Sequence, residues 1–141
     1  MAAADRFTIS TDPSLLDLEL VHRWLSEDAY WAIGRSLETV RKAAAGSINL
    51  AAFDANGRQC GYARIVTDRA TFAWVCDVYV EPQARGLGVG GQLARAVVDL
   101  VGPMDLKRVM LSTRDAHGVY ERVGFARIAG DDTIMMLGGP R

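Results

Sequence analysis

Residues 83–91 read QARGLGVGG, a glycine-rich stretch between an apolar run at 71–80 and residues with helical apolar spacing at 89–101. Glycine lacks a Cβ, so such a stretch lets backbone N–H groups turn outward and lets a ligand approach the main chain. The N-terminus of the following helix adds about half a positive charge, and Arg85 adds a full one. The stretch therefore predicts a phosphate-binding turn between a strand and a helix.

Two common phosphate-binding motifs do not fit this stretch. Gly86, Gly88 and Gly91 match the GxGxxG spacing of dinucleotide-binding proteins, but residues 81–85 separate the strand from the first glycine. The chain is also too short for two mononucleotide-binding halves. A Walker loop needs Gly-Lys followed by Ser or Thr, which is absent here. What these motifs share, glycines at a helix N-terminus, still predicts a phosphate ligand.

Working outward, turn and cap residues divide the rest of the chain into strands and helices. Asn56-Gly57 is a strong hairpin signal, Asp12-Pro13 is typical of a helix start, and Gly102-Pro103 ends a helix. Asp115 is expected to cap a short helix that ends at Gly124. We expect strands at 7–11, 48–54, 59–67, 71–80 and 108–113, a last pair of strands around Asp131-Asp132, and helices from Pro13 through Ser26, at 36–45, at 89–101 and through Val123.

This order is an antiparallel meander, one β-α-β crossover and a terminal hairpin. It predicts an α+β fold with a mixed, mostly antiparallel central sheet of about seven strands, flanked by about four helices.

Length, charge and cysteine usage narrow the class of protein. With 141 residues, half of them apolar, we expect a single domain over residues 1–141. Sixteen Lys and Arg against seventeen Asp and Glu, without charged blocks, argue against a nucleic-acid partner. The N-terminus lacks a signal pattern and no apolar run reaches the roughly 18–20 residues of a membrane span, so we expect a cytoplasmic protein without a membrane partner. Cys60 and Cys76 lack CxxC spacing, which argues against a metal site and favours small buried side chains.

Two motifs resemble those of the GNAT N-acetyltransferase family. Residues 78–90, VYVEPQARGLGVG, are similar to the family's acetyl-CoA signature. Residues 111–125, LSTRDAHGVYERVGF, resemble its C-terminal strand, short helix with tyrosine, and Gly-Phe. Residues 22–35, HRWLSEDAYWAIGR, look like those of a compact bacterial branch. The resemblance implies the GNAT fold and acetyl-CoA as the ligand of the glycine turn.

The resemblance also implies how the cofactor is held. Backbone amides of the turn would bind its pyrophosphate, and the main chain of the third long strand would bind the pantetheine arm, with one N–H polarising the thioester carbonyl. Thr113 stands where the family often has asparagine. The cofactor-binding residues expected on this basis are Val78, Tyr79, Val80, Arg85, Gly86, Leu87, Gly88, Val89, Gly90, Gly91 and Thr113.

For the chemistry, an acceptor amine must lose a proton and attack the thioester carbon, and a thiolate must leave. Tyr120 matches the family's tyrosine and can donate its proton as general acid. Strand alternation puts Trp74, Cys76, Val78 and Val80 on one face. Family bases often lie at positions matching Trp74 or Cys76, which here are neither acid nor histidine, so Asp77 is the expected base if a bulge turns it toward the substrate.

Asp68, Glu27, His117 and a water relay are weaker candidates for the base. We expect Tyr30 and Trp31, with Trp74 and Cys76, to bind the acceptor, because they can wall a pocket beside the strand. The expected partner is a small-molecule or peptide amine, and a homodimer is left open.

Two other functions remain open at this point. A non-catalytic acyl-CoA-binding or regulatory module would keep the glycine turn but would not need Tyr120. A ping-pong acyltransferase would use Cys76 as nucleophile, although no histidine adjoins it in the sequence.

Overall fold

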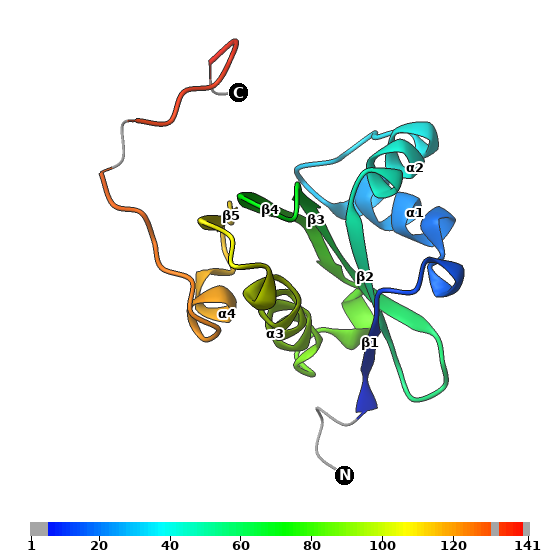
Figure 1. The fold of residues 1–141 in the computed structure, drawn as a ribbon. Helices are drawn as coiled ribbons and strands as arrows, with labels where there is room; N and C mark the ends of the chain where they lie inside the picture. Colours follow the sequence, from blue (N-terminus) through cyan, green and yellow to red (C-terminus); the bar gives the residue numbers. More distant parts are fainter. Residues whose placement is uncertain (1–5, 131–132, 140–141) are drawn as a thin grey trace.

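The computed structural model describes residues 6–130 and 133–139. In these residues five strands form one sheet in the order β1-β2-β3-β4-β5, antiparallel from β1 to β4 and parallel between β4 and β5 (Figure 1). The strands are β1 Thr8–Ser10, β2 Ile48–Phe53, β3 Gln59–Thr67, β4 Phe72–Val80 and β5 Arg108–Leu111. The helices are α1 Leu18–Asp28, α2 Leu37–Ala45, α3 Val89–Val101 and α4 His117–Glu121. The α+β class is confirmed, with five strands in the described residues rather than about seven.

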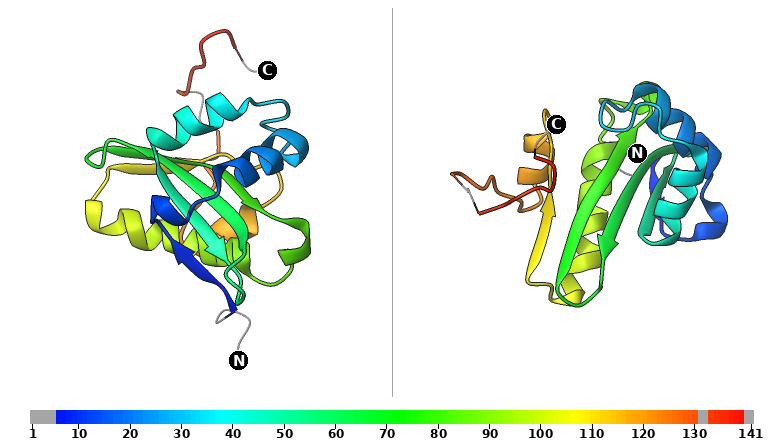
Figure 2. Two further views of the ribbon diagram at one scale, coloured as in Figure 1. Left: turned by 90° about the vertical axis from the view of Figure 1, so that its right-hand side faces the viewer. Right: turned by 90° about the horizontal axis from the view of Figure 1, so that it is seen from above.

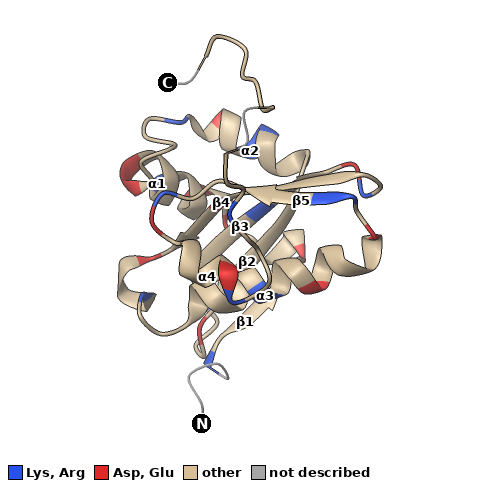
Figure 3. Cartoon of the chain, turned by 90° about the vertical axis from the view of Figure 1, so that its left-hand side faces the viewer, with Lys and Arg blue, Asp and Glu red and all other residues tan. Residues whose placement is uncertain are grey.

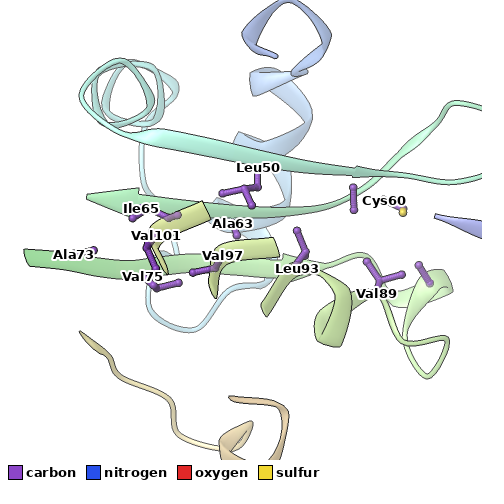
Figure 4. Packing of buried hydrophobic residues seen from close by; sticks show 12 residues of the cluster. Leu50, Cys60, Ala63, Ile65, Ala73, Val75, Val89, Leu93, Val97 and Val101 are labelled. Atoms are coloured by element: carbon purple, nitrogen blue, oxygen red, sulfur yellow. The ribbon is translucent and has the colours of Figure 1, made fainter. Parts of the chain in front are cut away.

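Helices cover both faces of the sheet. The helices α1 and α2 lie on one face and α3 on the other (Figure 2). On the α3 side, Leu93 and Val97 pack against apolar residues of β2, β3 and β4 such as Ile65 (Figure 4). On the α1 side, Val21 and Leu25 pack against Tyr62 and Tyr79 of the sheet. Among the described residues no helix is both long and apolar enough to cross a membrane.

The first helix begins later than predicted. The Asp12 carboxylate accepts hydrogen bonds from the N–H and hydroxyl of Ser14, so it caps a single turn of 3-10 helix at Pro13–Leu15. The chain is extended again at Leu16, and α1 starts only after Asp17, whose side chain accepts from the Leu20 N–H at 3.0 Å. Asp12 is therefore a helix N-cap, as predicted, but it caps the 3-10 turn and not α1.

A bulge at Asp77 changes which face each residue of β4 occupies. Asp77 has φ 52°, and the pairing of β4 with β3 shifts between Tyr62 and Arg64. Before the bulge, Val75 packs on the α3 side, and after it Val78 also packs there. Two residues of β4 thus stand opposite one of β3, which resets the alternation. The prediction that Trp74, Cys76, Val78 and Val80 share a face is wrong for this reason.

The C-terminal part differs most from the prediction. The N-cap of the short helix α4 is Ala116 rather than Asp115, without a side-chain cap, and the Ala116 N–H donates to Thr113 Oγ1 at 3.0 Å. Residues 126–130 and 133–139 form no strand, and Asp131-Asp132 lie outside the described residues. Gly130 and Gly138 have positive φ values that interrupt extended backbone. The segment after α4 runs away from the sheet (Figure 1), so the predicted last strands are not found in the described residues.

Candidate active site

The second half of β4 has an open edge. β5 pairs only with Phe72–Val75 and ends at Leu111, where the chain turns toward α4. Among the described residues no strand therefore neighbours β4 on this side beyond Val75. A cleft of about 940 Å³ follows this edge, walled by β4, the glycine turn, the start of α3, α4 and the segment after α1. The sheet thus splays open where the sequence predicted a ligand.

The glycine turn leaves the N-terminus of α3 uncapped. Gly86 and Gly88 have φ values of 80° and 90°, and Gly88 is the N-cap of α3 without a side-chain cap. A residue with a side chain would have a strained backbone at these positions because φ is positive. The space itself is free, since an added Cβ would meet no atom within 4 Å. The first N–H groups of α3 consequently face an open space, as an anion-binding helix terminus requires.

Arg85 does not extend freely into the cleft. Its Nε donates to the Val80 carbonyl at 2.8 Å, its Nη2 donates to Asp28 at 3.1 Å, and its guanidinium lies 5.3 Å from the centre of the Tyr79 ring. The hydroxyl of Tyr79 also donates to Asp28, at 2.6 Å. The charge of Arg85 is therefore shared with a carboxylate, and one carbonyl of the open edge is already occupied.

Two other arginines line the cleft and were missed from the sequence. Arg95 of α3 and Arg122 at the end of α4 are exposed there, and neither forms an ion pair with a described residue. Arg95 follows Gly88 by seven residues, two helical turns, so helical spacing could have placed it above the glycine turn. The position of Arg122 depends on the packing of α4, for which the sequence carries no such signal.

Asp77 is buried and lies at the centre of a cluster of hydrogen-bonded side chains. Its Oδ1 accepts from Trp31 Nε1 at 2.8 Å, and its Oδ2 accepts from Arg35 Nη1 at 2.8 Å and Arg64 Nε at 2.9 Å. Burial raises the pKa of this carboxyl, but the hydrogen bond from Trp31 and the charges of Arg64 and Arg35 outweigh it, so the pKa lies below its usual value. Asp77 is thus a firmly ionised carboxylate with donors on both oxygens, a poor arrangement for the expected base.

A second pocket of about 460 Å³ contains this cluster and Tyr120. The Tyr120 ring meets Phe125 edge to face at 5.9 Å, and its hydroxyl has no hydrogen-bond partner among the described residues. Burial, with a smaller effect from the charge of Asp115, raises the pKa of Tyr120 to about 12. Tyr30, Trp31, Val78, Asp115 and Ala116 line both the pocket and the cleft. The two spaces therefore adjoin just before the start of α4.

Most of the residues expected at the site come together. The expected residues that line the cleft or the pocket are Tyr30, Trp31, Trp74, Cys76, Asp77, Val78, Tyr79, Val80, Arg85, Gly86, Gly88, Val89, Gly90, Gly91, Thr113 and Tyr120. Leu87 instead lies in a separate groove beside Cys60. The hydroxyl oxygen of Thr113 accepts a hydrogen bond from the Ala116 N–H just before α4.

The weaker candidates for the base lie elsewhere. The carboxylate of Asp68 accepts from Thr71, Ala70 and Phe72 in the turn between β3 and β4, and these hydrogen bonds hold its pKa well below the usual value. Glu27 lines neither space, and His117 lines a neighbouring groove. Burial raises the pKa of the Cys76 thiol, and no histidine of the described residues lines its pocket, so nothing there activates a cysteine nucleophile.

An open sheet that splays beside an uncapped glycine turn has the architecture of an acetyltransferase. The chain belongs to the acetyltransferase (GNAT) family, whose sequence pattern matches residues 18–125. The resemblance seen in the two motifs is thereby confirmed.

Individual relatives agree with this assignment. A Gibberella zeae protein named provisionally as an acetyltransferase is 30% identical over 133 residues, which span 81% of this chain and 75% of that protein. A crystal structure assigned provisionally to the GNAT family from Xanthomonas campestris is 41% identical, with a TM-score of 0.85 over 92% of this chain and 91% of that one. The ribosomal-protein-S18-alanine N-acetyltransferase of Escherichia coli shares the fold, with a TM-score of 0.71 at 20% identity over 87% and 79% of the two chains.

Proposed function

We propose that the protein is an acetyl-CoA-dependent N-acetyltransferase that transfers the acetyl group by direct attack of a primary amine, with Tyr120 as general acid. The observation that carries the proposal is the path along the open edge of β4. It leads from the uncapped glycine turn to the pocket that holds the Tyr120 hydroxyl. A small-molecule or peptide amine is the proposed acceptor.

The residues of the glycine turn fit a pyrophosphate. A Cβ added at Gly86, Gly88 or Gly91 would meet no protein atom within 4 Å, so the space above the turn is open to a phosphate. The N–H groups at the start of α3 would donate to it, with Arg95 and Arg122 supplying positive charge nearby. When bound, acetyl-CoA supplies the acyl group as a thioester.

The open edge of β4 orients the reacting carbonyl in this proposal. Val78 follows the bulge and lines both the cleft and the pocket. A backbone N–H of this edge would donate to the carbonyl oxygen as negative charge develops on it. Val80 contributes less than expected from the sequence, because Arg85 already occupies its carbonyl.

Tyr120 donates the proton that the leaving sulfur needs. With its pKa raised to about 12, the phenol is fully protonated at neutral pH. The amine nitrogen bonds to the carbonyl carbon, the bond from carbon to sulfur breaks, the Tyr120 O–H hydrogen passes to sulfur, and the nitrogen releases its surplus proton to solvent. The leaving thiolate, whose thiol has a pKa of about 8.5, is a weaker base than the phenolate, so this acid assists the step modestly. Solvent then returns a proton to Tyr120.

The acceptor must lose a proton before attack, since an ordinary alkyl amine has a pKa of about 10.4. We assign its removal to solvent rather than to Asp77, whose oxygens already accept three hydrogen bonds. Asp77 acts as a positioning residue that holds Trp31, Arg35 and Arg64. Asp115, which lines both spaces and has no ion-pair partner among the described residues, holds the incoming ammonium group.

The test is a screen of amines, amino acids and peptides with acetyl-CoA, in which thiol release is measured. We expect release that depends on one class of amine. Thermal stabilisation by acetyl-CoA without release for any amine would instead support the binding module.

Labelled acetyl-CoA separates direct transfer from the ping-pong alternative. Protein incubated with it and no amine should stay unlabelled, and the Cys76→Ser variant should behave in the same way. Label that remains on wild-type protein but not on Cys76→Ser would contradict direct attack.

A further inference from the structure

The pocket of about 460 Å³ beside Tyr120, called the acceptor pocket from here on, contains two arginines around the Asp77 carboxylate. The side chains of Arg35 and Arg64 are only 22% and 15% exposed, and both bind the same oxygen of Asp77. Their two positive charges face one negative charge, so this end of the pocket carries an excess of one. Partial burial weakens the screening of that charge by solvent. This end of the pocket is therefore electrostatically suited to an anion.

Both guanidinium groups also keep unused donors. Among the described residues, Arg35 donates only through Nη1, which leaves its Nε and Nη2. Arg64 donates through Nε to Asp77 and through Nη1 to Ser47, which leaves its Nη2. Half-buried guanidinium nitrogens without partners are unfavourable unless solvent or a ligand accepts from them. A carboxylate is the anion that matches a forked pair of such donors.

The part of the pocket that adjoins the cofactor cleft carries a carboxylate instead. Asp115 lines both the pocket and the cofactor cleft, whereas Arg35 and Arg64 line only the pocket. Asp115 and the general acid Tyr120 line this same pocket. Arg114 lies against the Tyr30 ring at 3.7 Å, so its charge is at the rim rather than among the pocket-lining groups. An acceptor with an ammonium near Asp115 would thus point its other end toward the arginines.

We propose that the acceptor is an amine that also carries a carboxylate, as an amino acid does, and that Arg35 and Arg64 bind this carboxylate. The inference rests on the proposed function, since it names the substrate class of that site. The same arrangement disfavours polyamines, because a second ammonium would meet the two arginines. The aromatic rings of Tyr30, Trp31 and Trp74 give the pocket walls that tolerate an apolar side chain.

The test compares amines that differ only in the carboxylate. Phenylalanine, phenylalaninamide and phenethylamine form one matched set, and glutamate, methionine and alanine are tested against their amides in the same way. We expect kcat/KM for the preferred free acid to exceed that for its amide by about 10- to 100-fold, the range of a charge-assisted hydrogen bond. Amides or decarboxylated amines that react as well as the acids would overturn the proposal.

The arginines are tested through the same ratio. In Arg35→Gln the preference for the acid over the amide should fall to about one, while Arg35→Lys should keep part of it because the positive charge remains. A ratio unchanged in Arg35→Gln would remove Arg35 from the carboxylate site. Far-ultraviolet circular dichroism establishes that both variants fold.

A binding measurement separates this inference from the proposed function. In the presence of coenzyme A, the preferred acid should raise the melting temperature of the wild-type protein and its amide should not. Acid-selective stabilisation without turnover would contradict acetyl transfer and uphold the carboxylate site. Turnover without acid selectivity would uphold acetyl transfer and contradict the carboxylate site.

Discussion

The cofactor cleft and the acceptor pocket adjoin, yet they are built in different ways. Much of the lining of the cleft comes from one stretch of chain, in which β4 leads into the glycine turn and α3. The pocket depends on side chains that meet from distant positions, such as Trp31 and Arg35 on Asp77, 46 and 42 residues apart in the chain. A site built from one stretch of chain can be predicted from the sequence, whereas a site built from side chains that are distant in the sequence can be located only once the fold is known. The two halves should also respond differently to substitution.

Removal of the Asp77 carboxylate should have the largest effect, because it leaves two half-buried guanidinium groups without their counter-ion. We expect Asp77→Ala to lower the free energy of unfolding by about 3–5 kcal/mol, measured by urea denaturation at pH 7. The matched control is Glu19→Ala, which breaks the exposed ion pair with Arg41 and should cost about 0–1 kcal/mol. Equal losses in the two variants would show that the acceptor pocket does not rest on this cluster.

The sequence predicted the local features for physical reasons that are visible in the structure. The helix predicted at 36–45 does form, with Ser36 as the N-cap that accepts from the Thr39 N–H, and the turn at Asn56-Gly57 does join β2 to β3, with φ 79° at Gly57. Such signals act within four residues. The same reasoning failed at α4, whose N-cap is Ala116 rather than the predicted Asp115 and whose preceding backbone is held by the Thr113 hydroxyl.

The long-range features were outside the reach of sequence reasoning. The bulge at Asp77 was foreseen only as a condition for Asp77 to act, since nothing in the alternation of β4 fixes it. It depends on the pairing of β4 with β3, and it delivers Asp77 to Arg64 rather than to a substrate amine. The partners Arg35 and Arg64 were consequently missed, although their own strand and loop were placed correctly.

The glycine turn should fail by losing its ligand rather than its fold. Gly88→Val forces a β-branched residue to φ 90°, which reorients the N–H groups at the start of α3. At 100 times the Kd, acetyl-CoA should stabilise the wild-type protein by about 2.7 kcal/mol, and we expect no such stabilisation of Gly88→Val in a thermal melt. Asp99→Ala, an exposed change on the same helix outside the cleft, should keep the full shift. A normal shift in Gly88→Val would place the cofactor elsewhere.

Tyr120 lies where the two halves meet, and its hydroxyl should matter for turnover alone. Tyr120→Phe keeps the ring contact with Phe125 but removes the donated proton. General acids contribute about 100- to 10,000-fold, and the raised pKa together with the good leaving ability of a thiolate points to the low end. We expect kcat to fall about 100-fold with the acetyl-CoA affinity retained. An unchanged kcat would end the general-acid assignment, and loss of folding would give Tyr120 a structural role.

Acid should weaken the pocket cluster over a defined range of pH. Because the pKa of Asp77 is lowered in the folded protein, its ionised form contributes stability above the ordinary carboxyl pKa of about 3.9. That contribution is lost as the pH falls through the lower, folded value. We expect the difference in unfolding free energy between wild type and Asp77→Asn to be constant from pH 7 to 5 and to shrink below about pH 4. A difference that instead grows in acid would mean that Asp77 is protonated in the native state.

The smallest expected effect concerns nucleic-acid binding. Neither the cofactor cleft nor the acceptor pocket predicts any such binding. Acidic and basic residues are interspersed over the described chain (Figure 3), and the net charge of −1 offers little release of counter-ions from a polyanion. Phosphate binding at the glycine turn depends instead on the few N–H groups at the start of α3, which suit one pyrophosphate but form no extended basic surface for a duplex backbone. Fluorescence anisotropy with labelled transfer RNA at physiological salt should therefore show no submicromolar complex for wild type or for Gly88→Val. A tight complex that weakens steeply with salt and with Arg95→Ala or Arg122→Ala would mean that exposed side chains, rather than backbone N–H groups, dominate phosphate recognition in the cofactor cleft.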